Sequence, residues 1–427
     1  MRRVPWPSCC QDNTSCYRHF PLPAPERGIL PSYNQYAMEE ALHRNLAGVV
    51  RLSSTNAVLL DSPWRGWIAC CNRIFNMCEH PQHPPTYWER QQQQHCRGKH
   101  CPLLVVPMGV AFYNALSMRP VLNLLRMPAH VQRAVLFVAY EDSLGTWSSR
   151  FDHLEHVLQG HLADRPAIVS APHTTIALER EPPLSADASR RYAILAEWGM
   201  EKSEGPRMAF ASIAMELRQA LAGELRRRGA LYATSGFRHS LRLEWTHSAA
   251  DASRQIDRHA DLAAESEFCF EPPGDTPCRT HFYLAVLSGC LPVIFDGNLT
   301  TNLGLVAAGF TTWAWRTGPM TTVTRWKGNA DLPAISYSKF AIAFDAATAS
   351  RNPREVVDTL LAIPATKRKS MRKALLSVRH LFGWANDLSG PDARDVVAHL
   401  IEQRARALAA SNCGEEEPRA ERAACVA

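Results

Sequence analysis

Short continuous apolar runs of strand length, separated by helix-type segments, constrain the fold of this chain more than any other feature. Runs that are apolar throughout are typical of central strands in a parallel sheet, because such strands are buried on both faces. Their alternation with helical segments indicates βα units, which build doubly wound sheets that bind ligands beyond the carboxyl ends of their strands. The sequence therefore predicts an α/β fold. The predicted strands are residues 57–60, 103–107, 134–139, 167–170, 192–196, 230–233, 267–270 and 291–295. The predicted helices include residues 36–50, 207–228, 280–288 and 367–382.

Length and Pro-rich stretches predict the domain organisation. The chain has 427 residues, and at roughly 100–200 residues per domain this length predicts two or three domains. A Pro-rich shift near Pro182 and Pro183 indicates a boundary between them. We therefore expect an irregular arm over 1–30, one domain over 31–180, a second over 181–403 and a disordered tail over 404–427.

Charge and hydropathy argue against two classes of protein. The net charge is +6, and the Lys and Arg residues are dispersed along the chain. Nucleic-acid-binding surfaces require clustered basic residues, so we expect no nucleic-acid partner. A membrane-spanning helix needs about 20 mostly apolar residues. The apolar runs of this chain are much shorter and its first residues do not follow a signal-peptide pattern, so neither segment is expected in this sequence.

The cysteines leave three interpretations open. Many of the 13 cysteines lie before residue 102, where they suit either disulfides or unpaired buried thiols. A zinc site of Cys78, His80, Cys96 and Cys101 is the third interpretation, although the spacings match no structural zinc pattern. The segment 78–101 that contains this set is rich in Pro, His and Gln and is expected to be a loop.

The strongest chemical signal lies in residues 266–295, which read SEFCFEPPGDTPCRTHFYLAVLSGCLPVIF. The pattern predicts a strand, a rigid turn, a helix that begins near Thr280, and a second strand. Gly274 lets the backbone approach a ligand closely, and the amino end of the helix offers unpaired N–H groups to an anion. Arg279 adds a charge with bidentate geometry suited to phosphate. The alternative is an ordinary βαβ crossover in which Arg279 is solvated.

At these residues the chain resembles the exostosin-like glycosyltransferases, in particular the plant-type branch with xyloglucan galactosyltransferase-like proteins. The shared phrase is an FC-x-x-PPGD-x-P turn with an arginine, followed by a helix that ends in GC-[IL]-PV. Weaker similarity extends over residues 35–405 and includes residues 191–199 with Arg207. The resemblance implies a GT-B-type fold, in which two Rossmann-like doubly wound domains face a cleft. It places the acceptor on the amino-terminal domain and the nucleotide sugar on the carboxyl-terminal domain.

The resemblance also implies a reaction: inverting transfer of a sugar from a UDP-sugar to a glycan or glycoprotein acceptor, with no metal or other cofactor. Without a metal, helix N–H groups and Arg or Lys side chains must stabilise the leaving diphosphate. The residues expected to bind the donor are Lys202, Arg207, Gly274, Asp275, Arg279 and Thr280. A Golgi location and an oligomer with itself or with another glycosyltransferase complete what the resemblance implies.

Two positions depart from the family pattern. Leu284 stands where the family places a Glu or Asp that accepts hydrogen bonds from ribose hydroxyls. Ala134 and Val135 stand where the family has an Asp-His pair that supplies a candidate base. We therefore expect Glu141 and Asp142, which follow a predicted central strand, to be the catalytic residues. One alternative is a catalytically weak or inactive member that acts as the binding partner of an active glycosyltransferase. Another is a related enzyme that acts on a phosphorylated metabolite.

Five further side chains are candidates for a functional role, and three of them also have a structural interpretation. Glu271 and Asp275 are candidates to replace the ribose-binding carboxylate that is missing at position 284. His173 is a second candidate base, whereas a packed histidine is the alternative. Trp313 and Trp315 either stack on sugar rings or pack in the core.

Overall fold

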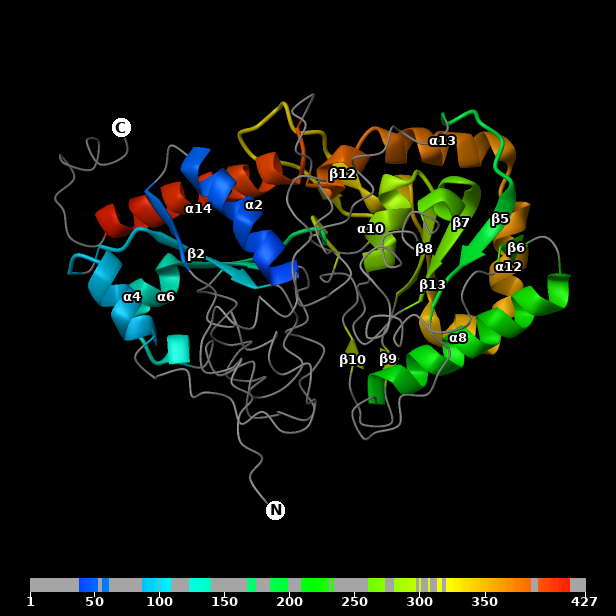
Figure 1. Cartoon of the computed structure of the whole chain (residues 1–427), viewed down its shortest axis with the longest axis horizontal. Coiled ribbons are helices and arrows are strands. Elements are labelled where there is room, and N and C mark those ends of the chain that lie inside the picture. Colours follow the sequence, from blue (N-terminus) through cyan, green and yellow to red (C-terminus); the bar gives the residue numbers. More distant parts are fainter. Residues whose placement is uncertain are drawn as a thin grey trace, which may run out of the picture. The chain divides into compact units, whose positions relative to one another are not determined.

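The chain forms two compact α/β units (Figure 1). The first contains Met1–Tyr140, Phe151–Val169 and Arg394–Ala427, and the second contains Glu141–Arg150 and Ser170–Ala393. The predicted α/β class, with a sheet in each half of the chain, is confirmed. The computed structural model describes residues 38–52, 56–60, 87–98, 100–108, 123–139, 167–173, 185–198, 209–229, 232–233, 260–272, 280–296, 299–300, 306–307, 313–316, 320–384 and 391–414.

The first unit is built on a sheet with the strand order β1-β2-β3-β4. Its strands are β1 (Ala57–Leu59), β2 (Leu103–Met108), β3 (Val135–Ala139) and β4 (Ala167–Ser170). β2 pairs in parallel with both β1 and β3, and Leu104 lies opposite Val135. Leu104 and Phe137 have no exposed surface, which explains why these strands are continuous apolar runs in the sequence.

The prediction that residues 78–101 form a loop is wrong for α4 (Tyr87–His95). Gln, Glu and Arg favour helix formation, and they make up most of this segment. Its Trp88 is fully buried and packs edge-on against Phe137 of β3, with ring centroids 6.4 Å apart. Composition does not predict this helix, because one large apolar side chain, Trp88, holds an otherwise polar helix against the core. Two further helices of the first unit are α2 (Met38–Leu52) and α6 (Ala129–Ala134).

Helix α14 (Ala393–Gly414) corrects two predictions about the carboxyl terminus. The chain was expected to be disordered from residue 404, but the helix continues past this point and buries Leu408. The beginning of this helix lies within the predicted second domain, whereas the helix groups with the first unit from Arg394 onward. Within the first unit, Nη2 of Arg404 on α14 donates a hydrogen bond to the carbonyl of Arg133 on α6 at 3.0 Å. Burial of one apolar stripe, to which Ile401 also belongs, explains the order.

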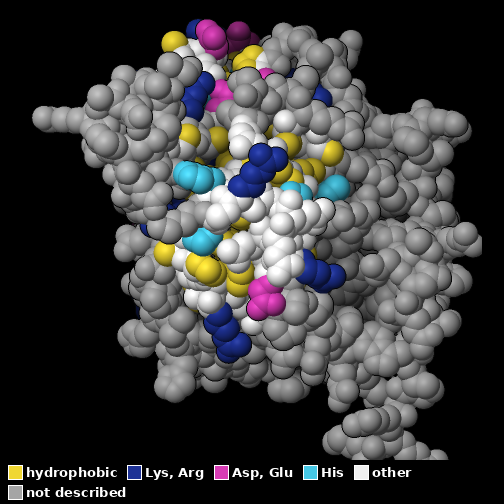
Figure 2. Space-filling view, turned by 90° about the vertical axis from the view of Figure 1, so that its left-hand side faces the viewer, with side chains coloured by type: hydrophobic (Ala, Val, Ile, Leu, Met, Phe, Trp, Pro, Cys, Tyr) yellow, Lys and Arg dark blue, Asp and Glu magenta, His cyan; other side chains and the backbone are white. Residues whose placement is uncertain are grey.

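Near α4, Cys96 and Cys101 form a disulfide. This bond removes both cysteines from the proposed zinc site, and Cys78 with His80 lies outside the described residues. Within the described part of the chain, no three His, Cys, Asp or Glu side chains are placed to hold a metal ion. Figure 2 views this end of the first unit and shows basic side chains scattered among apolar and polar ones, as their dispersal in the sequence predicts.

The second unit contains a fully parallel sheet with the strand order β13-β8-β7-β5-β6. Its strands are β5 (Tyr192–Ala196), β6 (Tyr232–Ala233), β7 (Ser266–Glu271), β8 (Leu291–Asp296) and β13 (Ile342–Asp345). Along the chain, β6 is added on one side of β5, and β7, β8 and β13 are added on the other. The direction of addition therefore reverses between β5 and β7, and doubly wound sheets bind ligands at such a switch point.

Helices cover both faces of this sheet, as a doubly wound fold requires. α8 packs with α11 and α12, whereas α10 and α13 pack on β8, and Figure 1 shows the two groups on opposite sides of the strands. The helices are α8 (Ala209–Arg228), α10 (Thr280–Leu287), α11 (Ala346–Arg351), α12 (Pro353–Ala362) and α13 (Ala365–Leu376). Shorter elements are β9 (Leu299–Thr300), β10 (Val306–Ala307), β11 (Val323–Thr324), β12 (Ile335–Ser336) and the 3-10 helices η8 (Tyr337–Lys339) and η9 (Arg379–Phe382). Among the helices in the described ranges, none has the length and apolar character needed to span a membrane.

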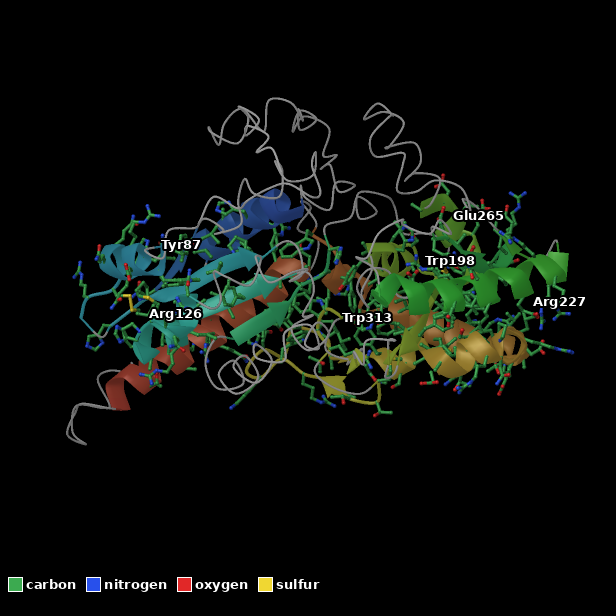
Figure 3. The ribbon with its side chains drawn as sticks, turned by 90° about the horizontal axis from the view of Figure 1, so that it is seen from below. Tyr87, Arg126, Trp198, Arg227, Glu265 and Trp313 are labelled. Atoms are coloured by element: carbon green, nitrogen blue, oxygen red, sulfur yellow. A yellow bond between two sulfur atoms is a disulfide. The ribbon has the colours of Figure 1, made fainter. Side chains whose placement is uncertain are left out.

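The end of α8 that carries Arg227, which is labelled in Figure 3, is held to α12 by an ion-pair network. Glu224 is buried and accepts hydrogen bonds from Arg227 at 2.7 Å and from Arg228 at 2.5 Å. Burial opposes ionisation of Glu224, but the two arginines outweigh it and lower the pKa of the carboxyl. Arg228 also donates to Asp358 of α12 at 2.6 Å, so one guanidinium joins the two helices.

Trp313 and Trp315 pack in the core of the second unit, so the interpretation that they stack on sugar rings is wrong. Their exposed fractions are 2% and 4%. The Trp313 ring lies 4.2 Å from the ring of Phe282 on α10, and Nε1 of Trp315 donates to the carbonyl of Leu381 at 2.7 Å. Trp315 has a φ of 61°, which is uncommon for a residue other than glycine. The packing and the hydrogen bond hold it in that conformation.

Candidate functional site

A small pocket lies at the switch point between β5 and β7. Its lining residues are Leu195, Glu197, Ala263, Cys269, Phe270, Glu271, His281, Leu284 and Ala285. About 20 Å³ of it is open to a water-sized molecule. Sites for whole small molecules measure about 300–1,000 Å³. The pocket that the described residues form is therefore too small to hold a whole small molecule.

Two carboxylates reach this pocket from adjacent strands. Glu197 directly follows β5, and Glu271 is the last residue of β7. Because Ala196 and Phe270 are register partners in this parallel pair, the residues that follow them lie side by side at the carboxyl edge of the sheet. Glu271 is only 3% exposed, and Glu197 is half-buried. Strand register thus brings two residues together that are far apart in the sequence.

His281 joins the helix α10 to the end of β5. It lies in the first turn of α10, and its Nδ1 is 3.2 Å from the carbonyl oxygen of Glu197. A carbonyl oxygen only accepts hydrogen bonds, so this contact requires the proton on Nδ1. The bond fixes the imidazole at the pocket and holds the amino end of α10 beside the carboxyl edge of the sheet.

Apolar side chains form the rest of the wall. Leu195 and Phe270 come from the two strands, and Leu284 comes from α10. Phe270 is supported from behind by Trp198, whose ring lies parallel to it with centroids 6.5 Å apart. Leu284 is half-buried and lines the pocket, so the position at which the chain departs from the family pattern faces this site.

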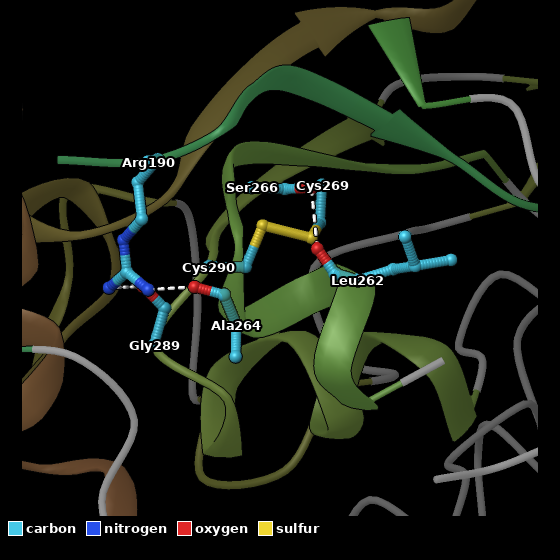
Figure 4. The surroundings of a disulfide bond; sticks show 7 residues. All are labelled: Arg190, Leu262, Ala264, Ser266, Cys269, Gly289 and Cys290. Atoms are coloured by element: carbon cyan, nitrogen blue, oxygen red, sulfur yellow. Dashed lines mark hydrogen bonds between the residues drawn. A yellow bond between two sulfur atoms is a disulfide. The ribbon is translucent and has the colours of Figure 1, made fainter. Parts of the chain in front are cut away.

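A second disulfide, beside the pocket, connects β7 to the turn that follows α10 (Figure 4). It joins Cys269, which lines the pocket, to Cys290, and both cysteines are buried. α10 ends in a Schellman motif: the N–H of Cys290 donates to Ala285 at 3.0 Å, and the N–H of Gly289 donates to Val286 at 3.2 Å. Gly289 has a φ of 73°, which this motif requires and which favours glycine.

Arg190 fixes the segments that flank this disulfide (Figure 4). Its guanidinium donates hydrogen bonds to the carbonyl of Ala264 and, at 3.4 Å, to the carbonyl of Gly289. Burial lowers the pKa of Arg190, the nearby charge of Arg372 lowers it further, and Glu267 acts in the opposite direction.

The structure describes only some of the residues that the sequence singled out. Thr280 begins α10, as expected, and α10 lies between β7 and β8, as the motif predicted. Ala134 and Val135 are fully buried, and His173 is buried with its ring stacked on Tyr283 at 5.1 Å. The predicted residues outside the described ranges are Glu141, Asp142, Lys202, Arg207, Gly274, Asp275 and Arg279.

Two polar residues of the pocket, Glu197 and His281, are not among the site residues predicted from the sequence. Both follow a recognisable signal, because one directly succeeds a predicted strand and the other lies in the first turn of a predicted helix. Glu271 was named only as a substitute carboxylate. Recognising the three as one site requires the strand order, which places β5 beside β7.

Comparisons with known proteins agree with the resemblance to the exostosin family. Residues 167–360 match the Exostosin GT47 domain. Xyloglucan-specific galacturonosyltransferase 1 of Arabidopsis thaliana is 41% identical over 54 residues, which are 13% of this chain and 8% of that protein. The probable xyloglucan galactosyltransferase GT19 of the same plant is 32% identical over 84 residues, 16% of this chain and 19% of that protein.

These matches span less than a fifth of the length of either plant relative. A solved GtfA/B complex aligns with 86% of this chain and 61% of its own chain, at a TM-score of 0.36 and 11% identity.

Proposed function

Because residues 167–360 carry an exostosin GT47 domain, we propose that this chain is an inverting glycosyltransferase that transfers a sugar from a UDP-sugar to a glycan acceptor. The observation that carries the proposal is the pocket at the β5/β7 switch point, where Glu197, Glu271 and His281 meet beside the amino end of α10. Doubly wound sheets bind nucleotides at such points, and acidic side chains there accept hydrogen bonds from ribose hydroxyls.

In this proposal each part of the donor has its own partner. The carboxylate of Glu271 accepts a hydrogen bond from a ribose hydroxyl, and Leu284 packs against the face of that sugar ring. The amino end of α10, which begins at Thr280, directs N–H groups to the diphosphate. Arg279 supplies positive charge at this helix opening, and we propose the same role for Lys202 and Arg207.

The proposed reaction is a single displacement. A base takes the proton from an acceptor hydroxyl, the oxygen attacks the anomeric carbon, and the bond from that carbon to UDP breaks as UDP takes the electron pair. We propose Glu141 or Asp142 as the base. Charge developing on UDP is stabilised by helix N–H groups and arginine, without a metal. An acceptor site on the first unit, a Golgi location and an oligomer with a glycosyltransferase belong to the same proposal.

An assay with a panel of UDP-sugars tests this function. We expect UDP to raise the melting temperature of the protein and at least one UDP-sugar to be turned over with EDTA present. Binding without turnover would favour an inactive partner protein. Binding of sugar phosphates without binding of UDP would contradict the proposed donor class.

We expect the substitution Glu271→Gln to weaken UDP binding by about 10- to 100-fold, because a hydrogen bond to a charged group contributes about 1.5–3 kcal/mol. Titration calorimetry measures the effect. Glu265→Gln is the matched control, because Glu265 precedes β7 at the opposite end of the strand and its side chain forms an exposed ion pair with Arg191 among the described residues. Equal UDP affinity of the two variants would remove Glu271 from the donor site.

A further inference from the structure

We propose that the disulfide Cys269–Cys290 positions α10 for nucleotide binding, so that the affinity for the donor depends on this bond. The inference rests on the proposed function of the pocket and adds a pair of positioning residues to it. Neither cysteine touches the ligand in this proposal. The bond acts through the helix that carries His281 and Leu284.

The disulfide joins β7 to the turn after α10, and both β7 and α10 contribute side chains to the pocket. Cys269 lies in β7, two residues before Glu271, and Cys290 is the last residue of the Schellman motif that ends α10. α10 has only 8 residues. Its first turn is held by the bond between His281 and Glu197, and the turn that follows its last residue is held by the disulfide. A short helix fixed at both ends keeps its pocket-facing side chains at one distance from the strand.

The disulfide packs against residues that line the pocket. The two cysteines belong to one buried cluster with Leu195, Ala263 and Ala285. All three of these neighbours also line the pocket, as Cys269 does. A change in the disulfide therefore reaches the pocket wall directly, because close-packed interiors transmit small displacements.

Thermodynamic linkage gives the proposal a second, independent consequence. If the oxidised bond raises the affinity for UDP by some factor, bound UDP must stabilise the oxidised bond by the same factor. Reduction converts the disulfide to two thiols while an added dithiol is oxidised to its own disulfide. UDP is therefore expected to shift this equilibrium toward the oxidised protein.

The first experiment compares two double variants. In Cys269→Ala/Cys290→Ala we expect UDP affinity, measured by calorimetry on the folded protein, to fall at least tenfold. Cys96→Ala/Cys101→Ala is the matched control, because it removes a disulfide of the first unit, and we expect its UDP affinity to stay within twofold of the wild type. Equal affinity of both folded variants would overturn the proposal. If the wild type fails to bind UDP, the proposed function fails instead.

The second experiment needs no variant and decides the matter if the first variant does not fold. The wild-type protein is equilibrated with dithiothreitol with and without UDP, and thiols are mapped by alkylation and mass spectrometry. We expect UDP to protect Cys269 and Cys290 at least tenfold while the reduction of Cys96 and Cys101 stays unchanged. Binding of UDP without protection of the Cys269–Cys290 bond would overturn the proposal.

Discussion

The substitution Arg372→Ala is expected to lower the free energy of unfolding by about 3–5 kcal/mol, the cost of removing one partner of a buried ion pair. Arg372 lies on α13 and is 6% exposed. Its Nη1 is 2.7 Å from both carboxylate oxygens of Glu267 in β7, and its Nε and Nη2 donate to the carbonyl of Ala186 at 3.1 and 2.9 Å. Alanine leaves this carboxylate, whose side chain is only 13% exposed, with a longer contact to Arg368 at 3.4 Å.

Urea unfolding measures this effect, and the neighbouring residue Lys369 provides a control. Its Nζ lies 2.5 Å from Asp187, but both side chains are more than half exposed. Exposed ion pairs contribute about 0–1 kcal/mol, so Lys369→Ala is expected to stay within that range. If the two variants of α13 lose the same stability, burial does not determine the strength of these pairs.

The substitution Leu284→Trp is expected to weaken UDP binding at least 100-fold, an estimate that corresponds to about 2.7 kcal/mol or more. Leu284 lines the small pocket, and an indole there takes the space that part of the nucleotide must occupy. Calorimetry with UDP gives the affinity, and thermal unfolding shows whether the variant folds.

Leu361→Trp is the control for the added indole. Leu361 lies in α12 and is 38% exposed, so a larger side chain there points into solvent and UDP affinity is expected to match the wild type. A folded Leu284→Trp protein that binds UDP as tightly as this control would mean that α10 does not face the donor.

The strands and helices around the motif could be predicted because their signals are local. The apolar run before Glu197 is β5, the run before Glu271 is β7, and α10 begins at the predicted Thr280. Buried strands need apolar residues on both faces. Pro and Gly residues before a helix mark in the sequence where that helix begins. The order of the strands in the sheet has no such local signal.

The site and two helices depend on contacts between distant residues, which composition does not reveal. Glu197 and Glu271 meet only because β5 pairs with β7. The Gln-rich α4 exists because Trp88 packs on Phe137, and α14 extends beyond residue 404 because Leu408 is buried. Tertiary burial overrides the polar composition in both helices.

Hydrogen exchange with and without UDP tests most directly whether the switch-point pocket is the donor site. We expect UDP to slow amide exchange in residues 195–198, 269–272 and 280–285, which carry the pocket side chains of β5, β7 and α10. Exchange in β1 and β2 of the first unit is expected to stay unchanged in this experiment. Binding of UDP with protection elsewhere and none in these three segments would contradict the assignment of the donor site.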